Sequence, residues 1–265
     1  MTWAWFNYDT ICRDDLNKML ITFPTLPHNQ NYNFIGVTGS KTFVVDPSVA
    51  ADVEEQLRKV DRGLDYILIT HHHWDHVGGV DELMKKYSCK LIVPKNFPLK
   101  KQNIERFVGE GDKVQVGEYS FTVMEVPGHT KDHIVYHDPS KQVAFVGDAL
   151  FRAGCGRNFE GTFEEFTESL WKIYQLPDET MIYCAHEYTK QNLKFALSLD
   201  PQNEELLAYD KKVDSLLQSG SFTIPFKLQD DKAQNPFLTV FNGLQSITGD
   251  TVGSVKSLRM QKDLF

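Results

Sequence analysis

Hydrophobic and polar positions in the first two thirds of the chain form short β-type runs that alternate with helical stretches. The runs Tyr32–Val37 and Thr42–Asp46 are rich in β-branched and aromatic residues, and Gly39-Ser40 between them predicts a hairpin turn. Further strands are predicted at Leu64–Thr70, Lys90–Val93, Lys113–Val116, Tyr119–Val126, Ile134–His137, Gln142–Val146 and Thr180–Ala185, and helices at Val49–Val60, Val80–Tyr87 and Phe163–Tyr174. This order predicts a layered α/β fold.

The pattern changes near Glu187, after which the chain is mostly helical. Helices are predicted at Glu187–Ser198 and Asn203–Gln218, a proline-containing loop follows, and the tail Val255–Asp263 is basic. We therefore expect an α/β domain over residues 1–187 and a smaller all-α domain over residues 188–265.

The composition is that of a folded globular protein. The chain has 265 residues, of which 41% are hydrophobic and 24% are charged, and its formal net charge is −8. A diffuse acidic balance disfavours a general nucleic-acid binder, and no apolar run approaches the length of a membrane span. We therefore expect neither a nucleic acid nor a membrane as partner.

The N-terminal segment and the cysteines bear on the cellular compartment in which the protein is expected. The aromatic segment Met1–Tyr8 is followed at once by charged residues, so it lacks the basic start and apolar stretch of a signal peptide. No C-x-x-C pair is present, which favours reduced thiols at Cys12, Cys89, Cys155 and Cys184. We expect a cytoplasmic protein, and delivery to mitochondria by a segment upstream of this sequence stays open.

A dense group of metal-ligand side chains follows the predicted strand Leu64–Thr70. Its skeleton is His71-x-His73-x-Asp75-His76, and neutral imidazoles with a carboxylate suit zinc or iron(II)-class ions. In an extended chain His71 and His73 project to one side and His72 to the other, so we interpret His72 as structural.

Three more candidate ligands also follow predicted strands, namely His129, Asp148 and His186. Taken singly, each is better explained as a surface or hydrogen-bonding residue. Loops at strand ends of layered α/β folds gather at one sheet edge, however, and would bring these side chains to the histidine cluster. Seven ligands exceed what one tetrahedral ion can use, which predicts two ions that share a bridging carboxylate and hydroxide.

The His-x-His-x-Asp-His skeleton with the later Gly-His-Thr and Gly-Asp resembles the metallo-β-lactamase superfamily. The resemblance implies an αββα sandwich with a dinuclear site at the sheet edges. It also implies that Asp75 hydrogen-bonds a metal-bridging hydroxide and so takes part in catalysis. The implied ligands are His71, His73 and His129 for the first metal and Asp75, His76 and His186 for the second, with Asp148 between them.

Longer motifs resemble the glyoxalase II (hydroxyacylglutathione hydrolase) family from about Asn31 to the end of the chain. The resemblance implies cleavage of S-D-lactoylglutathione to D-lactate and glutathione, the second step of methylglyoxal detoxification. The motifs are Thr70–Gly79, Ala153–Thr162, Tyr183–Thr189, Asn192–Ala196 and Asn235–Phe237.

The same resemblance implies a glutathione site at the junction of the two domains. It assigns five residues to this site, namely Arg157, Phe159, Tyr188, Arg259 and Lys262, and the two carboxylates of glutathione do need cationic anchors. By sequence alone, Arg259 and Lys262 are better explained as a solvated tail helix.

Three positions depart from the family pattern. Phe159 replaces a frequent tyrosine of the glutathione site, Asp132 replaces a glycine and Ala149 replaces a threonine. The substitution at Phe159 keeps an aromatic surface but removes a hydroxyl donor. None of the three removes a metal ligand.

Two alternative functions remain at this point. A mononuclear-iron glutathione persulfide dioxygenase shares the histidine motif but would lack a helical C-terminal domain. A metal-binding protein without catalysis would show damaged ligands, yet all seven are present. The ligand set favours zinc over iron or manganese without excluding either, and we expect a monomer that acts on a small glutathione thioester.

Overall fold

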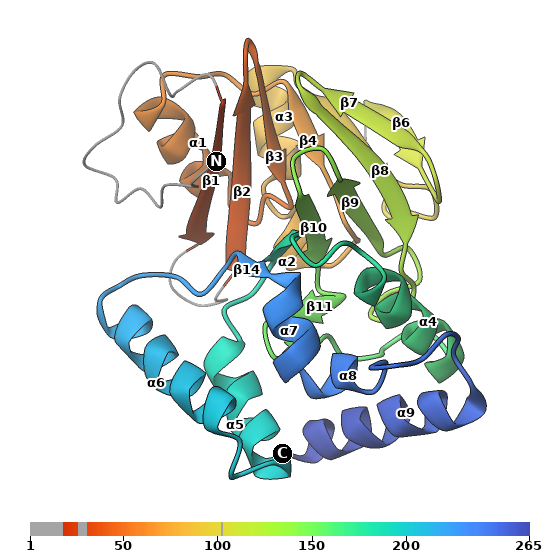
Figure 1. Ribbon diagram of the computed structural model, residues 1–265. Coiled ribbons are helices and arrows are strands. Elements are labelled where there is room, and N and C mark those ends of the chain that lie inside the picture. Colours follow the sequence, from red (N-terminus) through yellow and green to blue (C-terminus); the bar gives the residue numbers. More distant parts are fainter. Residues whose placement is uncertain (1–17, 26–30, 102) are drawn as a thin grey trace.

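The computed structural model describes residues 18–25, 31–101 and 103–265 (Figure 1). Cys12 and the aromatic segment Met1–Tyr8 lie outside the described residues. The strands form two six-stranded sheets, with orders β1-β2-β3-β4-β5-β6 and β14-β13-β10-β9-β8-β7, and a small hairpin of β11 and β12. Among the helices of the described ranges, none is long and apolar enough to cross a membrane. The cytoplasmic location stays a prediction.

The first sheet comprises β1 (Lys18–Thr25), β2 (Asn31–Thr38), β3 (Lys41–Val45), β4 (Tyr66–Leu68), β5 (Lys90–Pro94) and β6 (Ile104–Val108). The second comprises β7 (Lys113–Val116), β8 (Tyr119–Glu125), β9 (Ile134–Asp138), β10 (Val143–Gly147), β13 (Met181–Cys184) and β14 (Phe226–Lys227), and the small hairpin joins β11 (Leu150–Phe151) to β12 (Gly154–Cys155). The helices are α1 (Ala50–Lys59), α2 (Trp74–Val77), α3 (Val80–Tyr87), α4 (Phe163–Tyr174), α5 (Thr189–Leu199), α6 (Glu204–Gln218), α7 (Leu228–Gln234), α8 (Pro236–Thr239) and α9 (Gly249–Leu264).

Side-chain alternation along β2 places this strand between two apolar layers. Phe34 joins the core between the two sheets, where its ring lies 5.5 Å from that of Phe145. Ile35 and Val37 point to the other face and pack with residues of α1 and α3. On the far side, α4 packs against the second sheet through Phe166 and its apolar neighbours. The layers are thus helix, sheet, sheet and helix, which confirms the predicted α/β fold class.

The helical C-terminal part is confirmed as well, and it lies beyond the strand ends in Figure 1. The α5–α6 pair encloses a small core of its own that includes Leu193, Leu206 and Val213. The region predicted as a proline-containing loop instead holds β14, α7 and α8, and β14 pairs with β13 to extend the second sheet. The boundary expected between residues 187 and 188 stays a prediction.

A buried polar network ties the helical part to the β11–β12 hairpin. Arg152 is 2% exposed, and its Nη1 donates to Asp231 Oδ1 at 2.7 Å. The same oxygen accepts from the Ala153 amide at 2.7 Å. Asn235 Nδ2 donates to the Gly154 carbonyl at 2.9 Å and to Asp231 Oδ2 at 2.8 Å. These contacts fix the loop that follows Asp148, the predicted bridging residue.

Candidate metal centre and substrate pocket

All seven predicted ligand residues lie together beyond the strand ends. His71 and His73 follow β4, and the short helix α2 carries the next two ligands. His129 follows β8, Asp148 follows β10 and His186 follows β13. These strands end at the same edge of the two sheets, so four separate segments contribute to one centre.

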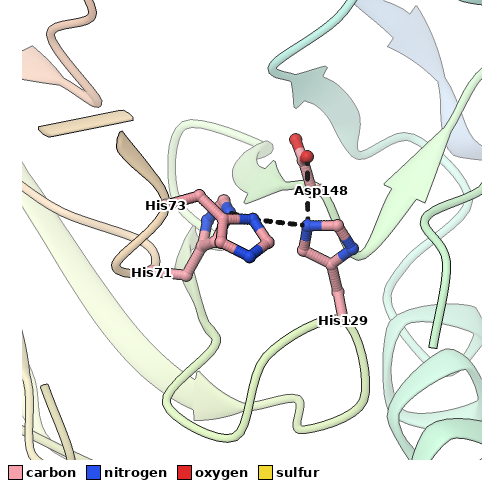
Figure 2. A group of neighbouring side chains, drawn as sticks. All are labelled: His71, His73, His129 and Asp148. Carbon is pink, nitrogen blue, oxygen red and sulfur yellow. Dashed lines mark hydrogen bonds and ion pairs between the residues drawn. The ribbon is translucent and has the colours of Figure 1, made fainter. Parts of the chain in front are cut away.

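The first group of donor atoms comprises His71, His73, His129 and Asp148, all within 4.8 Å of one another (Figure 2). His73 Nδ1 lies 3.0 Å from His129 Nε2 and 3.2 Å from His71 Nε2. Ring nitrogens that converge in this way cannot all be satisfied by hydrogen bonds to one another. Such convergence is the arrangement that a cation would stabilise.

The second group comprises Asp75, His76 and His186, also within 4.8 Å of one another. Asp148 lies between the two groups. Its Oδ2 is 3.3 Å from the Nε2 atoms of both His129 and His186, and its Oδ1 is 3.5 Å from His76 Nε2. The carboxylate of Asp148 therefore contacts both groups, as a bridging ligand must.

The donor atoms fit divalent cations. His76 Nε2 and Asp148 Oδ1 are buried and form no hydrogen bond within the part of the chain that the structure describes, and such atoms are costly unless a ligand satisfies them. Burial lowers the pKa of the His71 and His73 imidazoles, which favours the neutral form that binds metals. The fold and this histidine–aspartate cluster together indicate divalent metals.

Two supporting residues were missed by the sequence analysis. Asp46 accepts from the Thr70 amide at 2.8 Å and hydroxyl at 2.6 Å, and its Oδ2 lies 3.1 Å from His76 Nδ1. Asn31 donates to the carbonyl and to Oδ2 of Asp75, at 2.9 and 3.2 Å. Asp46 also follows a strand, so its position carried a usable signal, whereas nothing in the sequence marks Asn31. Both contacts orient ligand side chains.

Two further histidines, His72 of the histidine motif and His133, lie beside the predicted ligands. His72 Nδ1 is 2.7 Å from Asp132 Oδ1, and His72 belongs to neither group of donor atoms. The partner is the aspartate that departs from the family pattern. The His133 ring stacks on that of His71 at 4.6 Å, and its Nε2 accepts from the Asp148 amide at 3.1 Å. His133 therefore supports two predicted ligands at once.

A pocket of about 640 Å³ connects the donor groups to the helical part of the chain. Residues from α5 and α9 line it together with the loop after β12. The five residues assigned to glutathione by resemblance are all in this lining, which includes Arg157, Phe159, Tyr188, Arg259 and Lys262.

Arg259 and Lys262, the basic residues of α9 that line the pocket, have different surroundings. Arg259 is 3% exposed, so its interpretation as part of a solvated tail is wrong. Its guanidinium donates to the Cys155 carbonyl at 2.9 Å and pairs with Asp263 at 2.9 Å. Lys262 is half-buried, with its Nζ 5.0 Å from the centre of the Phe195 ring. Burial lowers the pKa of the Lys262 amine to about 8.

Aromatic rings flank the passage from the donor groups into the pocket. The Tyr188 ring stacks on that of His186, with centroids 4.7 Å apart. Phe159 is 60% exposed, and its ring centroid lies 5.3 Å from that of His129. These two rings present apolar surface to any ligand that reaches from the donor groups to the basic end of the pocket.

Comparisons with known proteins divide the chain into two matched regions. The family model of the metallo-beta-lactamase superfamily matches residues 25–186, and that of the hydroxyacylglutathione hydrolase C-terminus matches residues 187–265. The first match begins before Asn31, so the similarity extends further than the sequence motifs indicated.

Similar proteins include hydroxyacylglutathione hydrolases of two Aliivibrio species. The protein from Aliivibrio fischeri (strain MJ11) is 48% identical over 79% of this chain and 82% of its own length. That from Aliivibrio salmonicida is 47% identical over 89% of this chain and 96% of its own. Among solved structures, ETHE1 from Myxococcus xanthus shares the fold, with a TM-score of 0.62 and 22% identity over 92% of this chain and 99% of that one.

Proposed function

Because this chain belongs to the hydroxyacylglutathione hydrolase (glyoxalase II) family of the metallo-β-lactamase superfamily, we propose that it hydrolyses S-D-lactoylglutathione and related 2-hydroxyacyl glutathione thioesters. The products are the 2-hydroxy acid and glutathione. One observation carries the proposal: a single pocket joins the two donor groups to a basic end that suits the carboxylates of glutathione.

The donor groups would hold two divalent ions, with zinc favoured by the nitrogen and oxygen ligands. His71, His73 and His129 would hold one ion and Asp75, His76 and His186 the other, and Asp148 would bridge them. When bound, the ions supply Lewis acidity toward the thioester carbonyl and a nucleophilic water at neutral pH.

The side chains of this chain orient the reacting groups. Asn31 donates two hydrogen bonds to Asp75, and Asp75 would accept a hydrogen bond from the attacking water and so direct a lone pair of that water at the carbonyl carbon. His76 is held by Asp46, and His129 Nδ1 donates to the Arg157 carbonyl at 3.0 Å. Each contact leaves Nε2 of its imidazole directed at the donor groups.

The thiol half of the substrate would lie along the pocket toward α9. Phe159 and Tyr188 would pack against its apolar parts, and Lys262 would bind the glycine carboxylate at the basic end. A thiolate is a good leaving group, so the C–S bond can break without a strong general acid in the pocket. We also propose that the enzyme acts as a monomer.

The test is an anaerobic assay of the purified, zinc-loaded protein with S-D-lactoylglutathione, in which loss of thioester absorbance is followed. Turnover without O₂ is the expected result. No turnover under these conditions, together with oxygen-dependent consumption of glutathione persulfide by the iron-loaded protein, would instead identify a dioxygenase. Sedimentation of the active protein as a single-chain species would test the monomer.

A further inference from the structure

Four cationic side chains line the pocket, and two of them share one carboxylate. Asp263 Oδ1 lies 2.9 Å from Arg259 Nη2 and 3.3 Å from Arg157 Nε. Asp263 itself lines the pocket, and its single negative charge offsets one of the two positive charges of this arginine pair. Lys194 and Lys262 are the pocket cations that form no ion pair with a carboxylate among the residues that the structure describes, although the charge of Asp263 acts on Lys262 from a greater distance.

The helix α5 carries two lysines with different surroundings. Lys190 lies 2.8 Å from Asp210 and 2.7 Å from Asp214 on the neighbouring helix α6, so its charge is compensated. Lys194 follows four residues later and faces the pocket instead. Its side chain is exposed and pairs with no carboxylate within the described ranges. The charge of Lys194 is therefore available to a bound anion.

Lys194 and Lys262 approach the same end of the pocket from two helices. The Lys262 ammonium lies over the ring of Phe195, the residue next to Lys194 in α5. The Phe265 ring beyond the end of α9 also contacts Phe195, with centroids 5.6 Å apart. Figure 1 shows the ends of α5 and α9 side by side at this point. Two ammonium groups that form no ion pair among the described residues thus flank one rim of the pocket.

We propose that Lys194 binds the γ-glutamyl carboxylate of the substrate, while Lys262 binds the glycine carboxylate. This inference rests on the proposed function, because it takes glutathione as the thiol half. Glutathione carries one carboxylate on its γ-glutamyl residue and one on its glycine, and the pocket supplies two ammonium groups that form no ion pair with a carboxylate in the described part of the chain. Lys194 is in this view a specificity-determining residue that distinguishes glutathione from thiols without a γ-glutamyl carboxylate.

The experiment measures binding of S-methylglutathione to the zinc-loaded protein by calorimetry, which needs no turnover. Two analogues carry an amide in place of either the γ-glutamyl or the glycine carboxylate. Lys194→Gln should weaken binding of S-methylglutathione about two- to fivefold, since an exposed charge pair contributes little. The same variant should bind the γ-glutamyl amide as the wild type does. Lys262→Gln should weaken binding of S-methylglutathione and of the γ-glutamyl amide, but it should bind the glycine amide as the wild type does.

Two controls distinguish direct contact between Lys194 and the substrate carboxylate from an effect of the protein's net charge: the ionic strength and a matched lysine variant. The effect of Lys194→Gln should shrink toward onefold at high ionic strength, because exposed charges are screened. Lys211→Gln, an exposed lysine of α6 outside the pocket lining, changes the net charge equally and should bind like the wild type.

The outcomes are distinguishable. Wild-type-like binding by Lys194→Gln, or an equal loss with the γ-glutamyl amide, would overturn the assignment of Lys194. Failure of the wild type to bind S-methylglutathione and to hydrolyse lactoylglutathione would overturn the proposed function itself. Normal turnover by the wild type with an unaffected Lys194→Gln variant would leave the proposed function standing and remove only this inference.

Discussion

Gly156 lies directly against the carbonyl oxygen of Asp148, and a Cβ at Gly156 would be 2.0 Å from that oxygen. The same Cβ would lie 3.0 Å from His129 Nδ1. No flexible side chain can yield here, because the closest atom belongs to the backbone. Gly156→Ala should therefore displace the segment that carries Asp148, lower the metal content and reduce kcat by at least about tenfold.

Metal analysis and steady-state kinetics would check this expectation. Gly253→Ala is the matched control, because a Cβ at this position in α9 meets no atom within 4 Å. An alanine there should be neutral or stabilising by up to about 1 kcal/mol. Full metal content and activity in Gly156→Ala would contradict the close contact.

Asp148→Ala should impair both metal sites together. Its two carboxylate oxygens lie 3.3–3.5 Å from imidazoles of both donor groups, so one truncation removes a ligand from each ion. We expect less than one metal equivalent per chain after dialysis, against two in the wild type. Asp65→Ala, which removes a surface ion pair with Lys41, should retain two. Retention of one fully occupied site in Asp148→Ala would show that the carboxylate serves a single ion.

His72→Ala should retain most of the activity that His71→Ala loses. His72 pairs with Asp132 and belongs to neither donor group, and a partly exposed pair of this kind contributes about 0–1 kcal/mol. Steady-state kinetics on both variants, at equal zinc loading, provides the comparison. Equal inactivation of the two variants would place His72 among the ligands.

Substrate affinity should weaken at alkaline pH through Lys262. Its pKa is lowered to about 8 by burial, and a bound carboxylate raises this pKa in the complex because it stabilises the charged form. Affinity is therefore complete below about pH 8 and is lost as the pH rises through the pKa of the complex. KM should rise from about pH 7 to about pH 9.5 in the wild type.

The Lys262→Arg variant distinguishes titration of the Lys262 amine from titration of the amino group of the substrate. A guanidinium stays charged throughout the range, so the ratio of wild-type KM to Lys262→Arg KM cancels the titration of the glutathione amino group. We expect that ratio to increase with pH. A constant ratio would mean that Lys262 keeps its proton or does not contact the substrate.

Arg259 should behave as a structural residue rather than as a direct anchor. Its guanidinium satisfies the Cys155 carbonyl and pairs with Asp263, and a buried acceptor left without a donor costs about 1–3 kcal/mol. Arg259→Ala should therefore lower Tm by several degrees, whereas Lys262→Ala should leave Tm nearly unchanged. Thermal unfolding of both variants distinguishes the two roles. Equal Tm values for Arg259→Ala and wild type would contradict the assignment.

The central strands and long helices were predictable because their apolar residues recur with the period of about two residues of a strand or about 3.6 residues of a helix. The edge strand β6 was not, since Glu105, Arg106 and Phe107 are exposed and leave no apolar pattern. β14 has only two residues and forms by pairing with a strand more than forty residues away. Local patterns specify local structure, and these two strands depend on their neighbours in the sheet.

In the candidate site, too, local features were predictable from the sequence and contacts between distant segments were not. The ligand types were apparent from their density and from their positions after strands, whereas the support that Asn31 gives to Asp75 depends on a contact between distant segments. The burial of Arg259 likewise depends on the carbonyl of Cys155, which is 104 positions away in the chain. A single sequence carries no local signal for either contact.

The buried pair of Arg152 and Asp231 makes the α/β part an incomplete folding unit without the C-terminal segment. A chain cut after residue 187 would keep the guanidinium of Arg152 and lose the carboxylate that compensates it. Leaving one member of such a pair alone costs about 3–5 kcal/mol, a large share of the stability of a typical domain. Heat should therefore unfold the whole chain in one calorimetric transition. A relative that lost this helical segment in evolution would also need another residue in place of Arg152, because the carboxylate of Asp231 would be absent.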